Sequence, residues 1–260
     1  MTDFDPLVRA RTFDEVADLY DRMRPGQPAR VIDAVADRLP SFDGERLLEI
    51  GCGTGQATAP LAARGVPIHA IDRGASLIDV ARRRLAGADV TFEVADFLHW
   101  DPAITYPALL AAQCWHWIPA VEGLDRAARL LRPGAPLLLV WTLDRSEGTA
   151  FWRDTQPIYE EFLPSAKDQP PRTLPRITEE RIAGLAEHPD FDGVDVLRHS
   201  WPRTWADGTY LDLLRTQSPV RALEEDVRRR FLSAMAEVVD AHHGTVTREL
   251  ESLLVAARRA

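Results

Sequence analysis

The chain has 260 residues, of which 45% are hydrophobic and 27% charged, and a formal net charge of −9. A chain of this size and composition buries a core without disulfides or metals. The acidic balance argues against a nucleic-acid surface, which carries a basic excess. No apolar run reaches the roughly 20 residues of a membrane span, and residues 1–11 lack the apolar stretch of a signal peptide. We therefore expect a cytoplasmic protein that binds neither nucleic acid nor membrane.

Helices and short apolar strands alternate over the first half of the chain. Apolar side chains at helical spacing predict helices over 12–24 and 28–39. Beyond them we predict strands at 46–50, 68–71, 90–94, 108–112 and 136–141, and helices at 56–64, 76–85 and 121–131. Such alternation implies right-handed crossovers and a mostly parallel sheet. The predicted fold class is α/β, with a doubly wound sheet.

The pattern changes after residue 141. Residues 144–189 are rich in proline and charge, and we expect only short helical pieces there. A strand at 194–205, helices at 209–216 and 224–241 and a last strand at 245–254 follow. Long insertions are often covers over a functional site or loose linkers. We predict one domain over 1–260, with cap elements at about 1–27, 144–190 and 207–222.

Cys52 and Cys114 are the two cysteines of the chain, and neither has a CxxC partner. Lone cysteines are often small buried hydrophobes. The sequence therefore predicts no metal site and no disulfide framework.

The segment after the first predicted strand contains three glycines at alternate positions, Gly51, Gly53 and Gly55. Glycines there let the backbone turn sharply and approach a ligand at the carboxyl ends of the strands. A dinucleotide-binding loop has glycine at the sixth place of its motif, where this chain has Gln56. The lysine of a phosphate-binding loop is also lacking. The alternative is a tight turn that holds no ligand.

Acidic residues follow the second and third predicted strands. Asp72 can accept hydrogen bonds from both hydroxyls of a ribose, and we assign its neighbour Arg73 to the same site. Asp96 can accept from an adenine amino group while Phe97 covers the ring. Each acid has a structural alternative, Asp72 as a cap of the helix at 76–85 and Asp96 as a turn acid.

These segments resemble the signature of class I methyltransferases: Glu49 to Gly55, Asp72, Ala95-Asp96-Phe97 and Leu131-Arg132-Pro133-Gly134. The resemblance implies a Rossmann-like, seven-stranded sheet with the last strand antiparallel, and it adds Glu49 to the cofactor site. It also implies S-adenosylmethionine as cofactor, with S-adenosylhomocysteine as product. The flanking segments 13–20, 24–26, 115–117 and 210–218 resemble the trans-aconitate methyltransferase-like enzymes of small-molecule metabolism. Gln27, Gly74 and Ala135 depart from that pattern, where Tyr, Ser and Gly are frequent.

A Trp115-His116-Trp117 stretch follows the fourth predicted strand, where its loop would face the transferred methyl group. His116 would act as general base for a hydroxyl acceptor, whereas a carboxylate is already ionised. Aromatic faces of Trp115 and Trp117 would stabilise a neighbouring cation. The alternatives are that the tryptophans only cap the core and that His116 only bonds loop backbone.

The remaining candidates lie on both sides of this stretch. Arg24 could pair with the carboxylate of the cofactor's methionine end, with Tyr20 beside it. Gln113, at the tip of the fourth strand, could contact cofactor or substrate. The cap would contribute four substrate-binding residues: Trp152, Tyr210, Arg215 and Ser218.

The predicted activity is methyl transfer to a small molecule, at a carboxyl or hydroxyl oxygen, by a monomer or homodimer. Other readings are nitrogen or carbon as the acceptor, a dehydrogenase-like domain, an RNA or protein methyltransferase, and a cofactor-binding regulator or scaffold without catalysis.

Overall fold

The computed structural model describes residues 17–24, 26–163, 174–206 and 208–260. Within that range the chain divides into two compact units. The sheet unit comprises residues 26–143, 174–199 and 252–260, and the helical unit comprises the described parts of 1–25, 144–173 and 200–251. Among the described helices, none combines the length and apolar character that a bilayer crossing requires.

Seven strands form one sheet in the order β3-β2-β1-β4-β5-β7-β6. The strands are β1 (Leu47–Ile50), β2 (Ile68–Asp72), β3 (Val90–Val94), β4 (Leu109–Ala112), β5 (Pro136–Asp144), β6 (Phe191–Trp205) and β7 (Val246–Arg259). Strands β1 to β5 pair in parallel with one another. The last strand, β7, is antiparallel: Arg259 N–H donates to Ala135 O over 2.9 Å, and Gly134 N–H donates to Arg259 O over 2.7 Å. The predicted doubly wound, seven-stranded sheet is confirmed.

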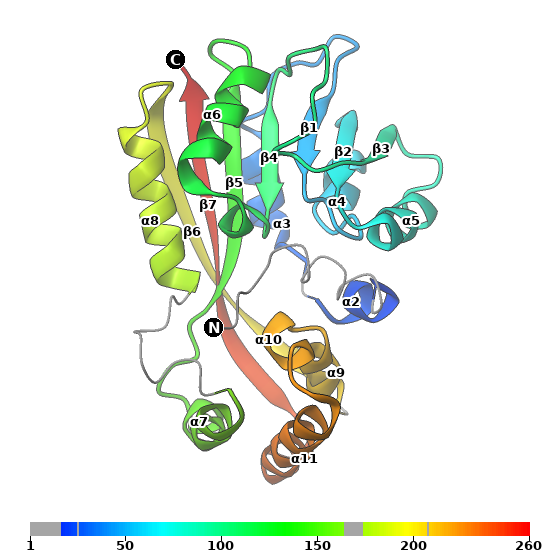
Figure 1. The fold of residues 1–260 in the computed structure, drawn as a ribbon, viewed down its shortest axis with the longest axis vertical. Coiled ribbons are helices and arrows are strands. Elements are labelled where there is room, and N and C mark those ends of the chain that lie inside the picture. Colours follow the sequence, from blue (N-terminus) through cyan, green and yellow to red (C-terminus); the bar gives the residue numbers. More distant parts are fainter. Residues whose placement is uncertain (1–16, 25, 164–173, 207) are drawn as a thin grey trace. The chain divides into compact units, whose positions relative to one another are not determined.

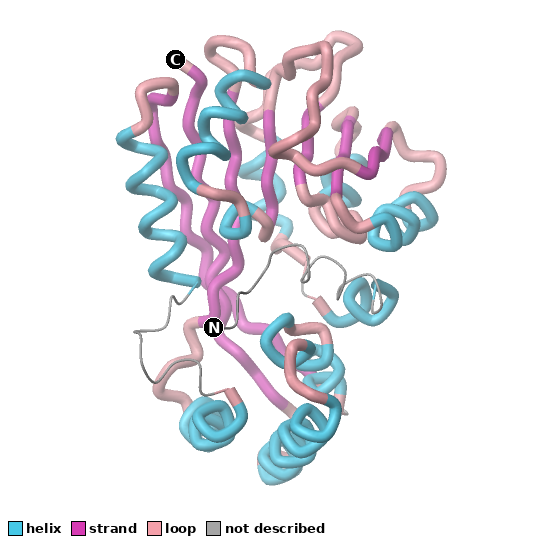
Figure 2. Tube along the Cα trace, in the orientation of Figure 1, coloured by secondary structure: helices cyan, strands magenta, loops and turns pink. Residues whose placement is uncertain are grey.

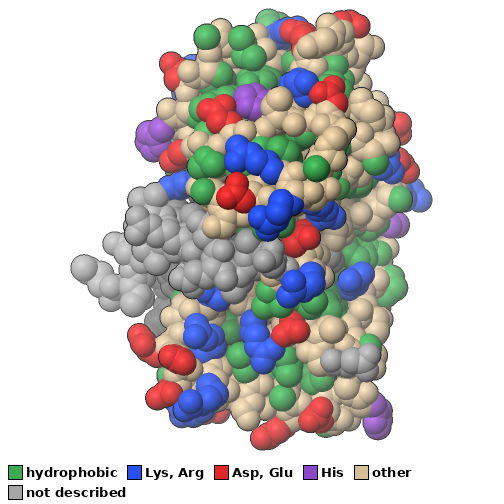
Figure 3. Space-filling model, turned by 90° about the vertical axis from the view of Figure 1, so that its right-hand side faces the viewer, with side chains coloured by type: hydrophobic (Ala, Val, Ile, Leu, Met, Phe, Trp, Pro, Cys, Tyr) green, Lys and Arg blue, Asp and Glu red, His purple; other side chains and the backbone are tan. Residues whose placement is uncertain are grey.

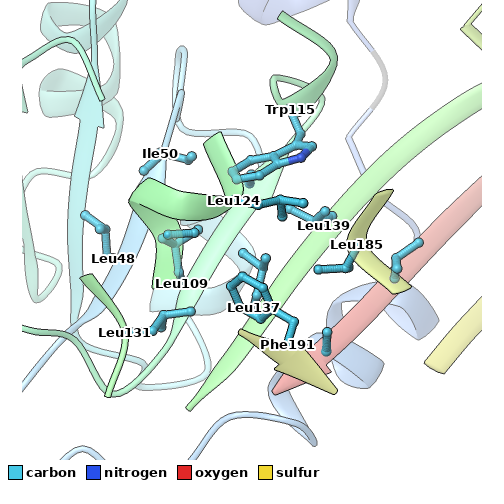
Figure 4. Packing of buried hydrophobic residues seen from close by; sticks show 14 of the residues in the cluster. Leu48, Ile50, Leu109, Trp115, Leu124, Leu131, Leu137, Leu139, Leu185 and Phe191 are labelled. Atoms are coloured by element: carbon cyan, nitrogen blue, oxygen red, sulfur yellow. The ribbon is translucent and has the colours of Figure 1, made fainter. Parts of the chain in front are cut away.

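Helices lie on both faces of this sheet (Figure 1). They are α3 (Ala29–Ala36), α4 (Thr58–Ala62), α5 (Ala75–Arg84), the 3₁₀ turn η1 (Trp115–Trp117), α6 (Ala120–Leu130) and α8 (Leu174–Glu187). Alternate strand residues enter two separate cores, as the period of two in a strand requires. Leu137 and Leu139 pack with α6 and α8, and Leu138 and Val140 pack with α3, α4 and α5. Figure 4 shows the first of these cores, from Leu48 on β1 to Phe191 on β6.

The helical unit has its own core. Its helices are α2 (Ala17–Met23), α7 (Ala150–Phe162), α9 (Thr209–Arg215), α10 (Ser218–Arg221) and α11 (Glu225–Ala241), drawn in cyan in Figure 2. Phe151, Tyr210, Phe231 and Met235 are among the buried residues that fill it. Such burial of large apolar side chains contributes about 1.5–3 kcal/mol per residue.

The insertion after residue 144 differs from its prediction. Instead of short helical pieces, it contains α7 with 13 residues and α8 with 14. Pro157 lies inside α7 with its side chain exposed, and the helix persists because Phe151 and Thr155 bury its other side. Thr149 caps its start by accepting a hydrogen bond from Trp152 N–H over 3.2 Å. α8 belongs to the sheet unit, although its residues fall within the range predicted for the cap.

Charged side chains of both signs share the surface. On the face drawn in Figure 3, Lys and Arg are interspersed with Asp and Glu, and hydrophobic side chains lie between them. Neither sign dominates that face.

Candidate active site

The loop after β1 turns through three left-handed glycines. Gly51, Gly53 and Gly55 have φ angles of +62°, +57° and +82°. Only glycine adopts such angles without steric cost. The loop is held by Cys52 N–H, which donates to Ile71 O over 3.2 Å, and by Gly55 N–H, which donates to Cys52 O over 3.0 Å. The sequence thus predicted this turn for the correct physical reason.

Two of these glycines have different surroundings. A Cβ at Gly51 would lie 2.6 Å from Cys114 Cβ on the adjoining β4 loop, so close packing requires glycine there. A Cβ at Gly53 would meet no atom of the described residues within 4 Å. Internal packing therefore leaves the space at Gly53 open, as a ligand that approaches the backbone would need.

Asp72 connects the glycine loop to the next loop. One carboxylate oxygen accepts a hydrogen bond from Gly53 N–H over 2.9 Å, and the other accepts from Gly74 N–H over 2.8 Å. Gly74 is the N-cap residue of α5. Asp72 is thus not the N-cap of α5, which has no side-chain cap hydrogen bond, and its bond to Gly53 joins it to the loop after β1.

Asp96 begins the loop after β3. Its carboxylate accepts a hydrogen bond from Leu98 N–H over 3.2 Å and lies 2.9 Å from His99 Nδ1. Arg73 Nε is 3.7 Å from the same carboxylate, so the structure brings these two candidates together. Phe97 is buried and packs against Trp115, with ring centroids 6.0 Å apart.

Glu49 is buried within β1, just before the glycine loop. Burial raises the pKa of its carboxyl group to about 8, and the charge of Asp72 acts in the same direction. Oxygen Oε2 accepts no hydrogen bond from any described residue. A buried acceptor of this kind is costly unless a donor reaches it, so Glu49 is suited to receive one from a ligand.

Gln113 lies at the tip of β4 with a backbone φ of +60°, which is rare for a residue other than glycine. Its side-chain amide donates to Thr142 O over 3.3 Å. Gln27 donates to Thr142 Oγ1 over 3.0 Å and accepts from Ser252 Oγ over 2.8 Å. In the sequence Gln27 is only a departure from the family pattern, and no local pattern links it to Thr142 or Ser252, which lie so far along the chain.

The stretch after β4 forms η1. Trp115 is 1% exposed and belongs to the core, beside Leu124 of α6 (Figure 4). Trp117 is 38% exposed, and its ring centroid lies 4.6 Å from that of His116. The structural alternative fits Trp115. His116 is half-buried, with Nδ1 fully buried, and Trp117 is exposed.

Six candidates lie in the helical unit. Tyr20 is in α2, and its side chain is outside the described set. Arg24 donates to Thr216 through Nε over 3.1 Å and through Nη2 over 3.0 Å. Tyr210 is buried and accepts from Arg248, which also bonds Ser146 and Asp144. Arg215 pairs with Asp212, and Trp152 and Ser218 are half-buried in α7 and α10.

Comparisons with known proteins bear on the sheet unit. Residues 47–134, from β1 to the turn before β5, match the family described as "Methyltransferase domain". This match lies within the sheet unit and covers about a third of the chain, so these residues are similar to a methyltransferase domain. The strand order of the sheet accompanies the match.

Individual relatives and solved structures extend the comparison. An uncharacterized methyltransferase of Mycobacterium bovis is 34% identical over 154 residues, which are 56% of this chain and 61% of that protein. The aligned part thus spans about three-fifths of this relative's length. A solved structure described as a candidate type II methyltransferase from Anaeromyxobacter dehalogenans is 26% identical, with a TM-score of 0.63 over 91% of this chain and 97% of that one.

The same fold occurs in a protein with another named activity. The [4+2]-cyclase SpnF is 18% identical, with a TM-score of 0.55 over 96% of this chain and 95% of that one. The fold alone therefore does not determine the reaction, and the residues of the site must carry that argument.

Proposed function

We propose that the protein uses S-adenosylmethionine to methylate a carboxyl or hydroxyl oxygen of a small molecule. The observation that carries the proposal is the bond between Asp72 and Gly53 N–H, 2.9 Å long, which unites the loops after β1 and β2. It brings the proposed ribose-binding acid close to a glycine at which a Cβ would meet no atom of the described residues within 4 Å. Topologically, this is the carboxyl edge of a doubly wound sheet, where such folds bind ligands.

The residues of the loop edge fit the adenosyl cofactor. Asp72 would bind the ribose hydroxyls, and Asp96 with Phe97 would bind the adenine. Gly51, Gly53 and Gly55 would admit the ligand to the backbone, and Glu49 would offer a buried acceptor. Gln113 and Arg73 complete the part of the site that lies in the sheet unit. Tyr20 and Arg24 are proposed for the carboxylate of the methionine end.

Methyl transfer requires little from the protein beyond positioning the acceptor against the cofactor. The sulfonium of the bound cofactor supplies an already activated methyl group. This chain's residues would align the acceptor for in-line attack and exclude water. His116 would hold the proton of a hydroxyl acceptor, whereas a carboxylate would need no base.

The trans-aconitate methyltransferase-like flanks support an oxygen acceptor in a small metabolite. In this proposal Trp117 of η1 contacts the substrate. Four residues of the helical unit are also proposed as substrate-binding: Trp152, Tyr210, Arg215 and Ser218. Trp115 would act through its position in the core, since it is 1% exposed.

Calorimetry tests the cofactor, and mass spectrometry tests the reaction. S-adenosylmethionine and S-adenosylhomocysteine should bind with one site per chain, and NAD should not. Incubation with panels of carboxylic acids and phenols should then yield products heavier by one methyl group. Absence of S-adenosylmethionine binding, or NAD binding in its place, contradicts the proposal.

A second candidate is a protein that binds the cofactor without methyl transfer. The likeness to SpnF supports this second candidate, because SpnF has the same fold and is named for a cyclisation and not for methyl transfer. Tight S-adenosylmethionine binding with no methylated product across the acceptor panels would support this second function.

A further inference from the structure

A cleft of about 770 Å³ lies in the sheet unit, away from the glycine loop. Its walls include Arg46 before β1, Tyr106 before β4, and Arg126 and Arg129 on α6. These positions mark the amino ends of β1 and β4, whereas the candidate active site is at their carboxyl ends. The cleft is therefore separate from that site.

Basic side chains predominate among the charged residues of this cleft. It is lined by Arg46, Arg126, Arg129 and Arg132 and by two acids, Glu45 and Asp101. This local excess of cations contrasts with the chain's net charge of −9. A concave surface with an excess of one sign of charge attracts ligands of the other sign.

Two of the four arginines already form ion pairs with carboxylates. Arg132 forms an ion pair with Glu45, in which Nη1 donates to Oε2 over 2.6 Å. Arg46 donates to the backbone oxygen of Asp89 over 3.1 Å and also pairs with its carboxylate. Because these partners already engage their guanidinium groups, we assign Arg46 and Arg132 to the wall of the cleft and not to the binding of a ligand.

Arg126 is different, because its side chain is 12% exposed and poorly paired. Its Nε and Nη2 are buried and make no hydrogen bond to any described residue. These two nitrogens form the edge of the guanidinium that binds an oxyanion through two parallel hydrogen bonds. The nearest carboxylate oxygen, from Asp101, is 3.5 Å from Nη2, which is beyond hydrogen-bond length.

Arg129 lies three residues further along α6, on the same face of the helix. It is exposed, and within the described ranges it has neither a hydrogen bond nor an ion pair. Arg126 and Arg129 thus offer two positive charges to one occupant of the cleft.

We propose that this cleft binds a small oxyanion, a phosphate or carboxylate group, between Arg126 and Arg129. The anion takes the place of the Asp101 carboxylate at the Nε–Nη2 edge of Arg126. Asp101 is 91% exposed, so its side chain is free to move aside at little cost. This second site goes beyond the proposed methyl transfer and does not depend on it.

The test is titration calorimetry of the whole protein with inorganic phosphate and with citrate, against sodium chloride of equal ionic strength. Arg126→Gln should weaken binding about tenfold or more, as expected for loss of a charge-assisted bidentate pair. Arg129→Gln should weaken it about two- to fivefold, because that side chain is solvated. Asp101→Asn should tighten it by a similar factor, since a competing carboxylate is removed.

Arg30→Gln is the matched control, because Arg30 is an exposed arginine of α3 outside the cleft and its loss should leave binding unchanged. Should Arg126→Gln fail to fold, Arg129→Gln and Asp101→Asn decide the matter at exposed positions. Binding of phosphate alone, or of citrate alone, identifies which oxyanion the cleft prefers. The proposal is overturned if wild-type protein binds neither anion in the millimolar range, or if the cleft variants bind both as wild type does.

Discussion

The carboxylate of Asp72 accepts a hydrogen bond from Gly53 N–H over 2.9 Å, nineteen residues back in the chain. The bond joins the loops after two neighbouring parallel strands, β1 and β2. One side chain therefore stabilises the shape of the glycine loop from the neighbouring strand.

Asp72→Ala should weaken S-adenosylmethionine binding by about tenfold or more, because ribose hydroxyls would lose charge-assisted hydrogen bonds and the loop its support. Asp72→Asn keeps one acceptor and should bind with intermediate affinity. Calorimetry gives both dissociation constants. Asp79→Asn, an exposed acid of α5 paired with Arg82, is the control and should bind as wild type does. Unchanged affinity in Asp72→Ala would exclude the ribose role.

Local patterns predicted much of the sheet unit. The strand at 46–50 was visible as an apolar run, and the structure has β1 at Leu47–Ile50. The left-handed turn at Gly51 followed from glycine chemistry alone. Both features depend on residues adjacent in sequence, which is the information a single chain provides.

Contacts between distant residues were beyond the sequence. Gln27 bonds Ser252, 225 residues away, and no periodicity predicts such a pair. The length of α7 was missed because Pro157 normally interrupts a helix, and only tertiary burial of Phe151 compensates. Similarly, no local pattern indicated that the hydroxyl of Tyr210 accepts a hydrogen bond from Arg248, 38 residues further along the chain.

Alanine substitutions at two glycines of the loop should distinguish an effect on the stability of the fold from an effect on S-adenosylmethionine binding. Gly53→Ala forces a left-handed alanine, at about 1–2 kcal/mol, but meets no neighbour. It should melt only slightly below wild type, while its methyl group obstructs the ligand and weakens S-adenosylmethionine binding strongly. Gly51→Ala places its Cβ only 2.6 Å from Cys114 Cβ, which is a steric clash. Its melting temperature should therefore fall much further than that of Gly53→Ala.

Thermal melts and calorimetry on the two variants provide the comparison. Gly65→Ala is the control for left-handed strain, since its φ is +79° and a Cβ there meets nothing within 4 Å. If Gly53→Ala and Gly65→Ala bind the cofactor equally well, the open space at Gly53 is not a ligand site.

Glu49 should make the stability of the ligand-free protein depend on pH. The folded protein keeps the proton of this buried group up to a pKa of about 8, whereas the ordinary value is 4.5. Between these values the unfolded chain binds fewer protons than the folded one, so stability falls as pH rises from 4.5 to 8 and then levels off. Glu49→Gln removes this loss and should gain up to a few kcal/mol over wild type by pH 8.

Urea unfolding of wild type and Glu49→Gln from pH 5 to pH 9 measures the effect. Glu122→Gln changes an exposed glutamate of α6 and should run parallel to wild type at every pH. A constant difference between Glu49→Gln and wild type would show that Glu49 titrates normally in the folded protein.

His116 should matter for one class of acceptor only. A phenol or alcohol must lose its proton as the methyl bond forms, so His116→Ala should slow that transfer about 100-fold or more, the usual contribution of a general base. A carboxylic acid is ionised at neutral pH, so its methylation should continue at nearly the wild-type rate.

Rates on paired acceptors, a benzoate and the corresponding phenol, distinguish this role from loss of structure, which would slow both. His199→Ala, a substitution in β6, is the matched control and should leave both rates unchanged. Full activity of His116→Ala on the phenol would show that the imidazole serves only to pack against Trp117, 4.6 Å away between ring centroids.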